Sequence, residues 1–134
     1  MRATLRTWAA YGLLTATLIA STPPALGEQG GLEGSWSGNG WIVLPSGGTE
    51  RARCRASFRR QSGNSFAMSA QCATTSVRVA QTASLRRSAA NHFKGDFYNA
   101  EYGVSGTITI TVHGNKLSAS LSGGGGSAHF TMSK

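Results

Sequence analysis

The side chains that could act as acids, bases or metal ligands are few and lie far apart in the sequence. The three histidines, His92, His113 and His129, lack the spacing of a metal site. No serine occupies a Gly-x-Ser-x-Gly motif. Asp96 and Glu101 lie close together around an expected turn, where carboxylates are usually solvated. We therefore expect neither an enzyme active site nor a bound metal or other cofactor.

The two cysteines form the pair with the clearest chemistry. Cys54 and Cys72 are not in a Cys-x-x-Cys redox motif, and no histidine lies near either of them in the chain. An even pair in an exported protein is normally a structural disulfide. Folding the chain about Gly63 places Cys54 opposite Cys72 on neighbouring strands, so we predict a bridge between them. It should contribute roughly 3 kcal/mol, mainly by restricting the unfolded chain.

Arginines form a pattern along one expected strand. Four of them alternate with small or apolar residues and share the parity opposite to the cysteines, and a fifth follows on a later strand: Arg51, Arg53, Arg55, Arg59 and Arg78. From Arg53 to Arg59 the strand would extend about 20 Å. One interpretation is an anion-binding surface for a polysaccharide, a lipid phosphate or an acidic protein. The other is an outer face that only keeps the protein soluble.

Nucleic acid is not an expected partner of these arginines. Phe58 and Phe66 have the apolar parity of their strands, so they do not alternate with the arginines as stacking platforms would. Trp41 and Tyr98 have the parity of the polar face, but the sequence does not say how far they lie from the arginines.

The elements that must position these residues are strands. Apolar residues alternate with Ser, Thr, Arg, Lys or Asn along most of the chain, and 18 glycines favour turns. A hairpin at Gly114-Asn115 would place Val112 opposite Leu117, and a turn through 123–126 would place Ala119 opposite Phe130. Only the short segment 82–90 could also be a helix.

These hairpins predict an all-β fold. About eight short strands joined by short turns suit an antiparallel up-and-down meander, and closing it into a barrel would remove the exposed strand edges. A two-sheet sandwich is the alternative, because alternation alone does not separate the two.

The first residues have the features of an export signal. Arg2 and Arg6 precede an apolar run of about 13 residues, Trp8–Ala20, which is shorter than a membrane-spanning helix requires. Small residues precede an expected cleavage site near Gly27. We predict a signal peptide over 1–27, a flexible lead-in over 28–33 and one domain over 34–134. Removal of the signal would leave 11 basic and five acidic residues, and we expect a periplasmic or secreted protein.

The start of the expected domain resembles a known family. Gly34-Ser35-Trp36 is similar to the Gly-x-Trp opening of lipocalin-like β-barrels. In that family an arginine late in the chain covers the tryptophan, and here the last strand offers Lys134. The export signal, size and disulfide also resemble periplasmic metalloprotease inhibitors built on an eight-stranded barrel, although their later tryptophan is missing. The resemblance implies a small lipocalin-like barrel.

Two functional hypotheses follow. The first is an exported, non-enzymatic binding module whose basic face recognises an anionic ligand or partner in the cell envelope, or which holds a small apolar ligand. A barrel of this size should have little room for an internal ligand, so we expect binding at the surface rather than in the interior. The alternative is a protease-inhibitor-like interaction protein whose lead-in, 28–32, enters the cleft of a partner. The oligomeric state stays open.

Overall fold

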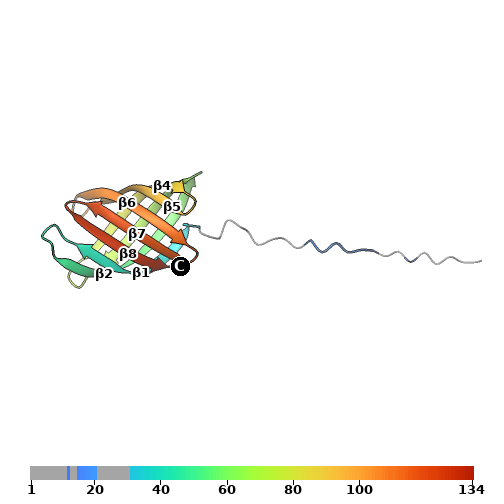
Figure 1. Cartoon of the computed structure of the whole chain (residues 1–134), viewed down its shortest axis with the longest axis horizontal. Helices are drawn as coiled ribbons and strands as arrows, with labels where there is room; N and C mark the ends of the chain where they lie inside the picture. Colours follow the sequence, from blue (N-terminus) through green and yellow to red (C-terminus); the bar gives the residue numbers. More distant parts are fainter. Residues whose placement is uncertain (1–11, 13–14, 21–30) are drawn as a thin grey trace, which may run out of the picture.

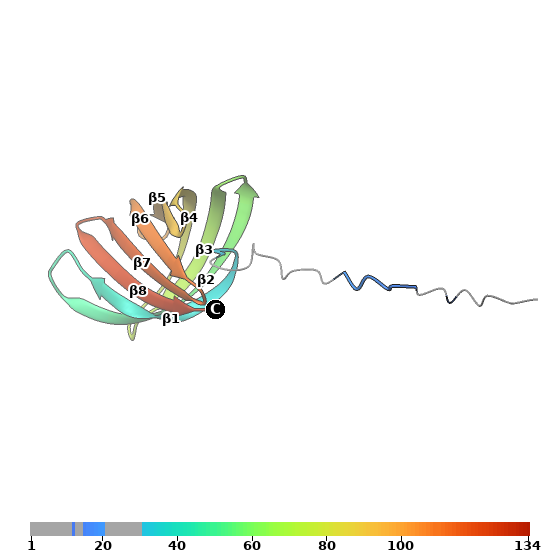
Figure 2. The same ribbon diagram turned by 45° about the vertical axis from the view of Figure 1, so that its right-hand side comes forward.

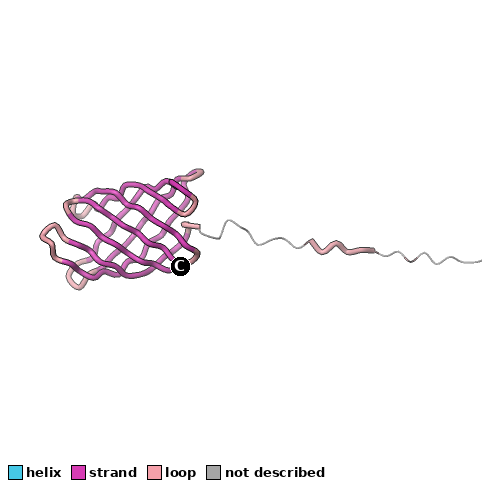
Figure 3. The backbone as a smooth tube through the Cα atoms, viewed as in Figure 1, coloured by secondary structure: helices cyan, strands magenta, loops and turns pink. Residues whose placement is uncertain are grey.

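Eight antiparallel strands form one closed barrel in the computed structural model, which describes residue 12, residues 15–20 and residues 31–134 (Figure 1). Each strand pairs with its neighbours in sequence, and β8 pairs with β1. The strands cross one another obliquely on the front and back walls (Figure 3). Their bounds are β1 (Gly34–Val43), β2 (Thr49–Ser62), β3 (Ser65–Ala73), β4 (Arg78–Ala89), β5 (His92–Asn99), β6 (Val104–His113), β7 (Lys116–Gly123) and β8 (Gly126–Ser133).

The predicted barrel is therefore confirmed, and the sandwich alternative is wrong. The segment 82–90 is not a helix, because 82–89 belong to β4 and pair with both β3 and β5. Cross-strand pairing has overridden any helical tendency of this segment. No helix among the described residues is long and apolar enough to span a membrane. Most of the predicted signal peptide and residues 28–30 of the predicted lead-in lie outside the described residues, so both stay predictions.

The predicted hairpin registers are confirmed. Cys54 lies opposite Cys72, Val112 opposite Leu117 and Ala119 opposite Phe130. Gly63 and Gly114 both have positive φ angles in the corresponding turns, a conformation that glycine adopts without steric cost. Alternate residues therefore point into the barrel and make its core, as the alternation predicted.

Closure of the barrel depends on two glycines of β1. A β-carbon at Gly38 would collide with the carbonyl oxygen of Thr131, and one at Gly40 would collide with that of His129. Both oxygens belong to β8, the strand that pairs with β1 across the closing seam. Glycine is used here because it lets the two backbones approach closely where the sheet bends.

Aromatic and cationic side chains cover one end of the barrel, which we call the closed end. The Trp36 indole Nε1 donates a hydrogen bond to the Leu32 carbonyl oxygen at 2.9 Å, and both residues are buried. Lys134 Nζ lies 5.3 Å from the centroid of the Trp36 ring, in the place that the lipocalin resemblance gives to an arginine. Phe66 and Phe93 pack edge to face with their centroids 5.2 Å apart.

Charged side chains lie over this aromatic layer. The Arg87 guanidinium is 4.9 Å from the Phe93 centroid, and that of Arg60 is 5.6 Å from the Phe66 centroid. Arg60 also forms an ion pair with Glu33 at 3.0 Å. Such cations add attraction to the ring faces while staying partly hydrated. The end of the predicted lead-in thus contacts the barrel through Leu32 and Glu33.

The predicted disulfide is present inside the barrel. Cys54 on β2 and Cys72 on β3 are bonded, 18 residues apart in sequence, and both are buried. We expect the double variant Cys54→Ala/Cys72→Ala to lose about 3 kcal/mol of unfolding free energy, because its unfolded chain is no longer cross-linked. Urea unfolding followed by far-UV circular dichroism measures this loss. Chemical reduction of the unmodified protein should give a similar loss, and an unchanged urea midpoint in both samples would contradict the expectation.

The β1–β8 seam gives a second stability prediction. We expect Gly40→Ala to lower the unfolding free energy by at least about 2 kcal/mol, because the added methyl group must push two paired backbones apart. The matched control is Gly48→Ala in the loop after β1, where a β-carbon would meet only ordinary contacts at 3.7 Å. That variant should stay within about 0.5 kcal/mol of the unmodified protein. Equal stability of the two alanine variants in urea would show that the seam tolerates a side chain.

Candidate functional site

The barrel is packed unevenly along its axis. Its largest fully buried side chains include Trp36, Phe66, Phe93 and Leu85, and the aromatic contacts among them lie at the closed end. At the opposite end, inward positions of β7 and β8 are occupied by Gly123, Gly126 and Ala128 and by other small side chains. These small residues leave space inside this end of the barrel. Figure 2 shows this end at the left, where it carries the β1–β2 and β7–β8 loops, and we call it the open end.

A cavity of about 410 Å³ occupies the open end. This volume is in the lower part of the range of about 300–1,000 Å³ that is typical of small-molecule sites. Apolar side chains from β1, β4, β5, β6, β7 and β8 make most of its wall, including Ile42, Val79, Phe97, Val104, Leu121 and Phe130. The sequence analysis expected little internal space, and this expectation is wrong because the bulky residues gather at the closed end.

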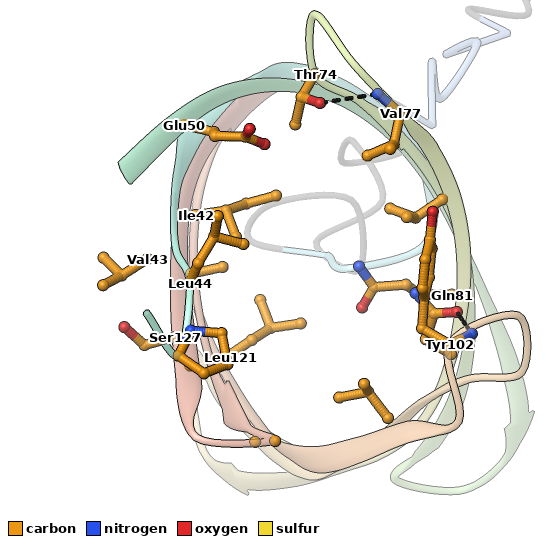
Figure 4. A pocket seen from close by; sticks show the side chains of 18 of the residues that line it. Ile42, Val43, Leu44, Glu50, Thr74, Val77, Gln81, Tyr102, Leu121 and Ser127 are labelled. Atoms are coloured by element: carbon orange, nitrogen blue, oxygen red, sulfur yellow. Dashed lines mark hydrogen bonds between the residues drawn. The ribbon is translucent and has the colours of Figure 1, made fainter. Parts of the chain in front are cut away.

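Local hydrogen bonds order the loops around the cavity. In the loop after β3, the Thr74 hydroxyl oxygen accepts hydrogen bonds from the backbone N–H groups of Ser76 and Val77 at 3.2 and 3.1 Å. After β5, the buried Asn99 side-chain oxygen accepts one from the Tyr102 N–H at 3.2 Å. Figure 4 shows Thr74, Val77 and Tyr102 around the lumen. These hydrogen bonds give the two loops a defined conformation beside the entrance.

Two polar side chains point into the lumen from opposite walls (Figure 4). Glu50 enters from the start of β2 and is half-buried, and among the described lining residues it alone carries a charge. Gln81 enters from β4, and its Oε1 atom is buried without a hydrogen-bond partner among the described residues. A buried acceptor without a donor is destabilising, so such an atom in a cavity marks a place where a ligand group can bind.

Gln81 also marks the floor of the cavity. Together with Leu121 and Phe130 it lines both the cavity and a smaller void of about 30 Å³ deeper in the barrel. The disulfide and Met68 line that inner void. The buried aromatic residues Phe66 and Phe93 fill the closed end of the barrel.

The large exposed apolar side chains of the barrel also gather near the open end. Among the described residues 31–134 these are Trp41, Val43, Leu44, Val77, Tyr98 and Tyr102. Five of them lie near the ends of β1 and β5 or in the loops that follow these strands, and Val77 lies in the loop between β3 and β4. By contrast, the turns at the closed end have the polar sequences Ser62-Gly63-Asn64 and Gly114-Asn115. An apolar rim therefore continues the apolar wall of the cavity outward.

The predicted arginine site lies on the outside of the barrel, away from the cavity. Arg51, Arg53, Arg55 and Arg59 are exposed on the outer face of β2, and Arg78 is exposed at the start of β4. Arg53 and Arg78 both lie opposite Ala73 of β3, so the structure brings these two to the same row of the sheet. Arg51 contacts an aromatic residue whose place the sequence left open, since its guanidinium lies 5.1 Å from the Trp41 ring centroid.

The candidate catalytic and metal-binding residues are dispersed. His92 and His129 are exposed and pair with hydroxyl oxygens of Thr111 and Ser120, each at 3.1 Å. In the part of the chain that the structure describes, no three His, Cys, Asp or Glu side chains lie close enough to hold a metal.

The sequence analysis missed Glu50 and Gln81. Both have the inward parity of their strands, because Glu50 continues the series of Ala52 and Cys54, and Gln81 that of Val79 and Ala83. A polar residue at an inward position was the signal that could have found them. The sequence could not show that these two positions face an unfilled part of the barrel.

Comparisons with known proteins identify the fold alone. No family model matches the chain, and no curated protein matches it. The chain is similar to a redesigned β-barrel, mFAP1, in a structure bound to DFHBI, with a TM-score of 0.65, 11% identity, and coverage of 77% of this chain and 94% of that one. It is also similar to a de novo designed fluorescence-activating β-barrel, with a TM-score of 0.59, 10% identity, and coverage of 76% and 92%. These likenesses establish a small eight-stranded antiparallel barrel.

Proposed function

We propose that the protein is an exported, non-enzymatic binding protein that holds a small, largely apolar molecule in the open end of its barrel. The observation that carries the proposal is the cavity of about 410 Å³ with mostly apolar walls at the open end of the barrel. Concave, mostly apolar pockets with a few polar groups are the usual form of a small-molecule site. A redesigned barrel of the same fold was found bound to DFHBI, which supports the idea that barrels of this size accept a ligand.

The apolar rim supports the same proposal. Leu44, Val77 and Tyr102 are partly exposed beside the entrance and also line the cavity. Exposed apolar groups of this kind lose contact with water when a ligand covers them. They provide an apolar path from solvent to the interior, and the hydrogen-bonded loops that carry them need not move for a ligand to enter.

A second candidate function is recognition of an anionic ligand or partner by the outer arginine face of β2. The register gives these arginines uncharged cross-strand neighbours: Asn39 and Ala73 beside Arg53, and Ser37 and Gln71 beside Arg55. None of Arg51, Arg53, Arg55 or Arg59 forms an ion pair with a described residue. The face therefore carries positive charge that no described acidic side chain neutralises, and its cross-strand neighbours are uncharged. Such a face suits a polysaccharide, a lipid phosphate or an acidic protein.

The protease-inhibitor hypothesis has less support. It requires the lead-in to enter a partner's cleft, yet Leu32 is buried and its carbonyl oxygen accepts the Trp36 hydrogen bond. Insertion of this residue into a partner would uncover the aromatic layer at the closed end. We therefore retain ligand binding as the proposed function.

The cavity proposal predicts that filling the lumen blocks binding. N-phenyl-1-naphthylamine, a neutral dye that fluoresces in apolar surroundings, should bind the purified protein saturably. We expect Val79→Phe to weaken this binding at least about tenfold, because the ring occupies the space of the ligand. The matched control is Ala80→Phe, the next residue on β4, which points to solvent. Failure of the unmodified protein to bind the dye and other apolar probes, or equal binding by both variants, would overturn the proposal.

The arginine face gives a separate prediction, tested on immobilised heparin as an anionic polysaccharide. We expect Arg53→Glu/Arg55→Glu to elute at lower salt than Arg86→Glu/Lys94→Glu. The control pair lies side by side on the outer faces of β4 and β5, so the total charge changes equally. Specific binding by the arginine face depends on where the positive charge lies, whereas non-specific attraction to heparin depends on the net charge alone. Identical elution of the two variants would show that these arginines act only as general surface charge.

A further inference from the structure

We infer that the ligand of the cavity is an amphipathic cation, with an apolar body and a protonated amine or similar donor group. The inference rests on the proposed function and adds the chemical class of the ligand. Its basis is the pair of polar side chains that enter the lumen, Glu50 and Gln81, each of which presents an acceptor. The charge inside the cavity is thus opposite in sign to that of the outer arginine face.

Glu50 supplies the negative charge. Its position opposite Ile42 at the beginning of β2 directs its side chain inward, whereas its neighbour Arg51 points outward to Trp41. The carboxylate forms no ion pair with another described residue. A carboxylate only accepts hydrogen bonds. A cationic donor entering the cavity would give it the partner that the described part of the chain does not.

Gln81 extends the preference for donors to the floor of the cavity. Its Oε1 atom is buried and has no partner among the described residues. Apolar side chains such as Leu121 and Phe130 surround this floor and cannot donate a hydrogen bond. A ligand that brings only acceptors, such as a carboxylate, would leave Oε1 unpaired, although the amide Nε2 of Gln81 can donate a hydrogen bond to it. The charge of Glu50 therefore disfavours anions, and Gln81 favours a ligand that also carries a donor.

The outer arginines do not reverse this preference. Their guanidinium groups are exposed, and in physiological salt exposed charges are screened over a distance of about 8 Å. Glu50 is half-buried in a mostly apolar lumen, where a charge is less screened than on the outer surface and acts more strongly on a nearby group. The formal charge of the whole protein can speed or slow the approach of a ligand. Glu50 determines which sign of ligand charge is preferred inside the cavity.

Competition between three probes of equal chain length tests the inference. Decylamine, decan-1-ol and decanoate are each titrated against the protein–dye complex at neutral pH and physiological salt, below their micellar concentrations. We expect protonated decylamine to displace N-phenyl-1-naphthylamine at least about tenfold more tightly than decanoate, as expected for one gained charge-assisted hydrogen bond. Decan-1-ol should fall between them, because it donates a hydrogen bond but carries no charge.

Three variants test which residues cause the preference for decylamine. Glu50→Gln should remove the advantage of decylamine over decan-1-ol, whereas Glu101→Gln, an exposed loop substitution with the same charge change, should not. Gln81→Met should weaken decylamine and decan-1-ol, which can donate to Oε1, by more than it weakens decanoate, which can only accept from the amide Nε2. Urea unfolding checks that each variant is folded. If a folded Glu50→Gln protein keeps the full preference for decylamine, the assignment to Glu50 is wrong.

The outcomes separate this inference from the function on which it rests. Tight binding of the dye and decan-1-ol without preference for decylamine would overturn the inference and leave the ligand-binding function standing. A preference for decanoate would overturn it as well and would indicate that the outer arginines control the entrance. Absence of binding by the dye and by all three probes would overturn the proposed function itself, and the inference with it.

Discussion

The pairing of β1 with β8 is the constraint on which the rest of the structure depends. It converts a chain of hairpins into a closed wall without free edges, and it determines how much space the interior has. The two backbones can approach along this seam because Gly38 and Gly40 present no β-carbon to the carbonyl oxygens of β8. With the wall closed, the inward side chains of eight strands must fill one fixed volume.

Those side chains fill the volume unequally. Trp36, Phe66 and Phe93 close one end, and Arg87 and Lys134 lie over their rings. Glycine and alanine at inward positions of β7 and β8 leave the other end open. A cavity in this fold therefore results from where large and small residues lie along the barrel axis. The same distribution explains why the disulfide, between the two ends, lines only a small void.

Closure of the barrel also places side chains that are adjacent in the sequence in two different environments. Glu50 and Arg51 are consecutive, yet one side chain enters the lumen and the other lies against Trp41 outside. Each strand has this two-sided character, so a basic outer surface and a mostly apolar lumen with one carboxylate occur in the same small protein. The two candidate binding functions use opposite faces of one wall and do not compete for residues.

The sequence by itself determined the local features: the strands, the hairpin registers and the disulfide. Alternation and turn residues act over a few positions, and a hairpin about Gly63 leaves one register in which Cys54 meets Cys72 on the apolar side. Only the tertiary structure decided between barrel and sandwich, placed Trp41 beside Arg51, and showed that Glu50 and Gln81 face an open lumen. These features depend on contacts between strands far apart in sequence and on the total volume of all inward side chains, which no local pattern contains.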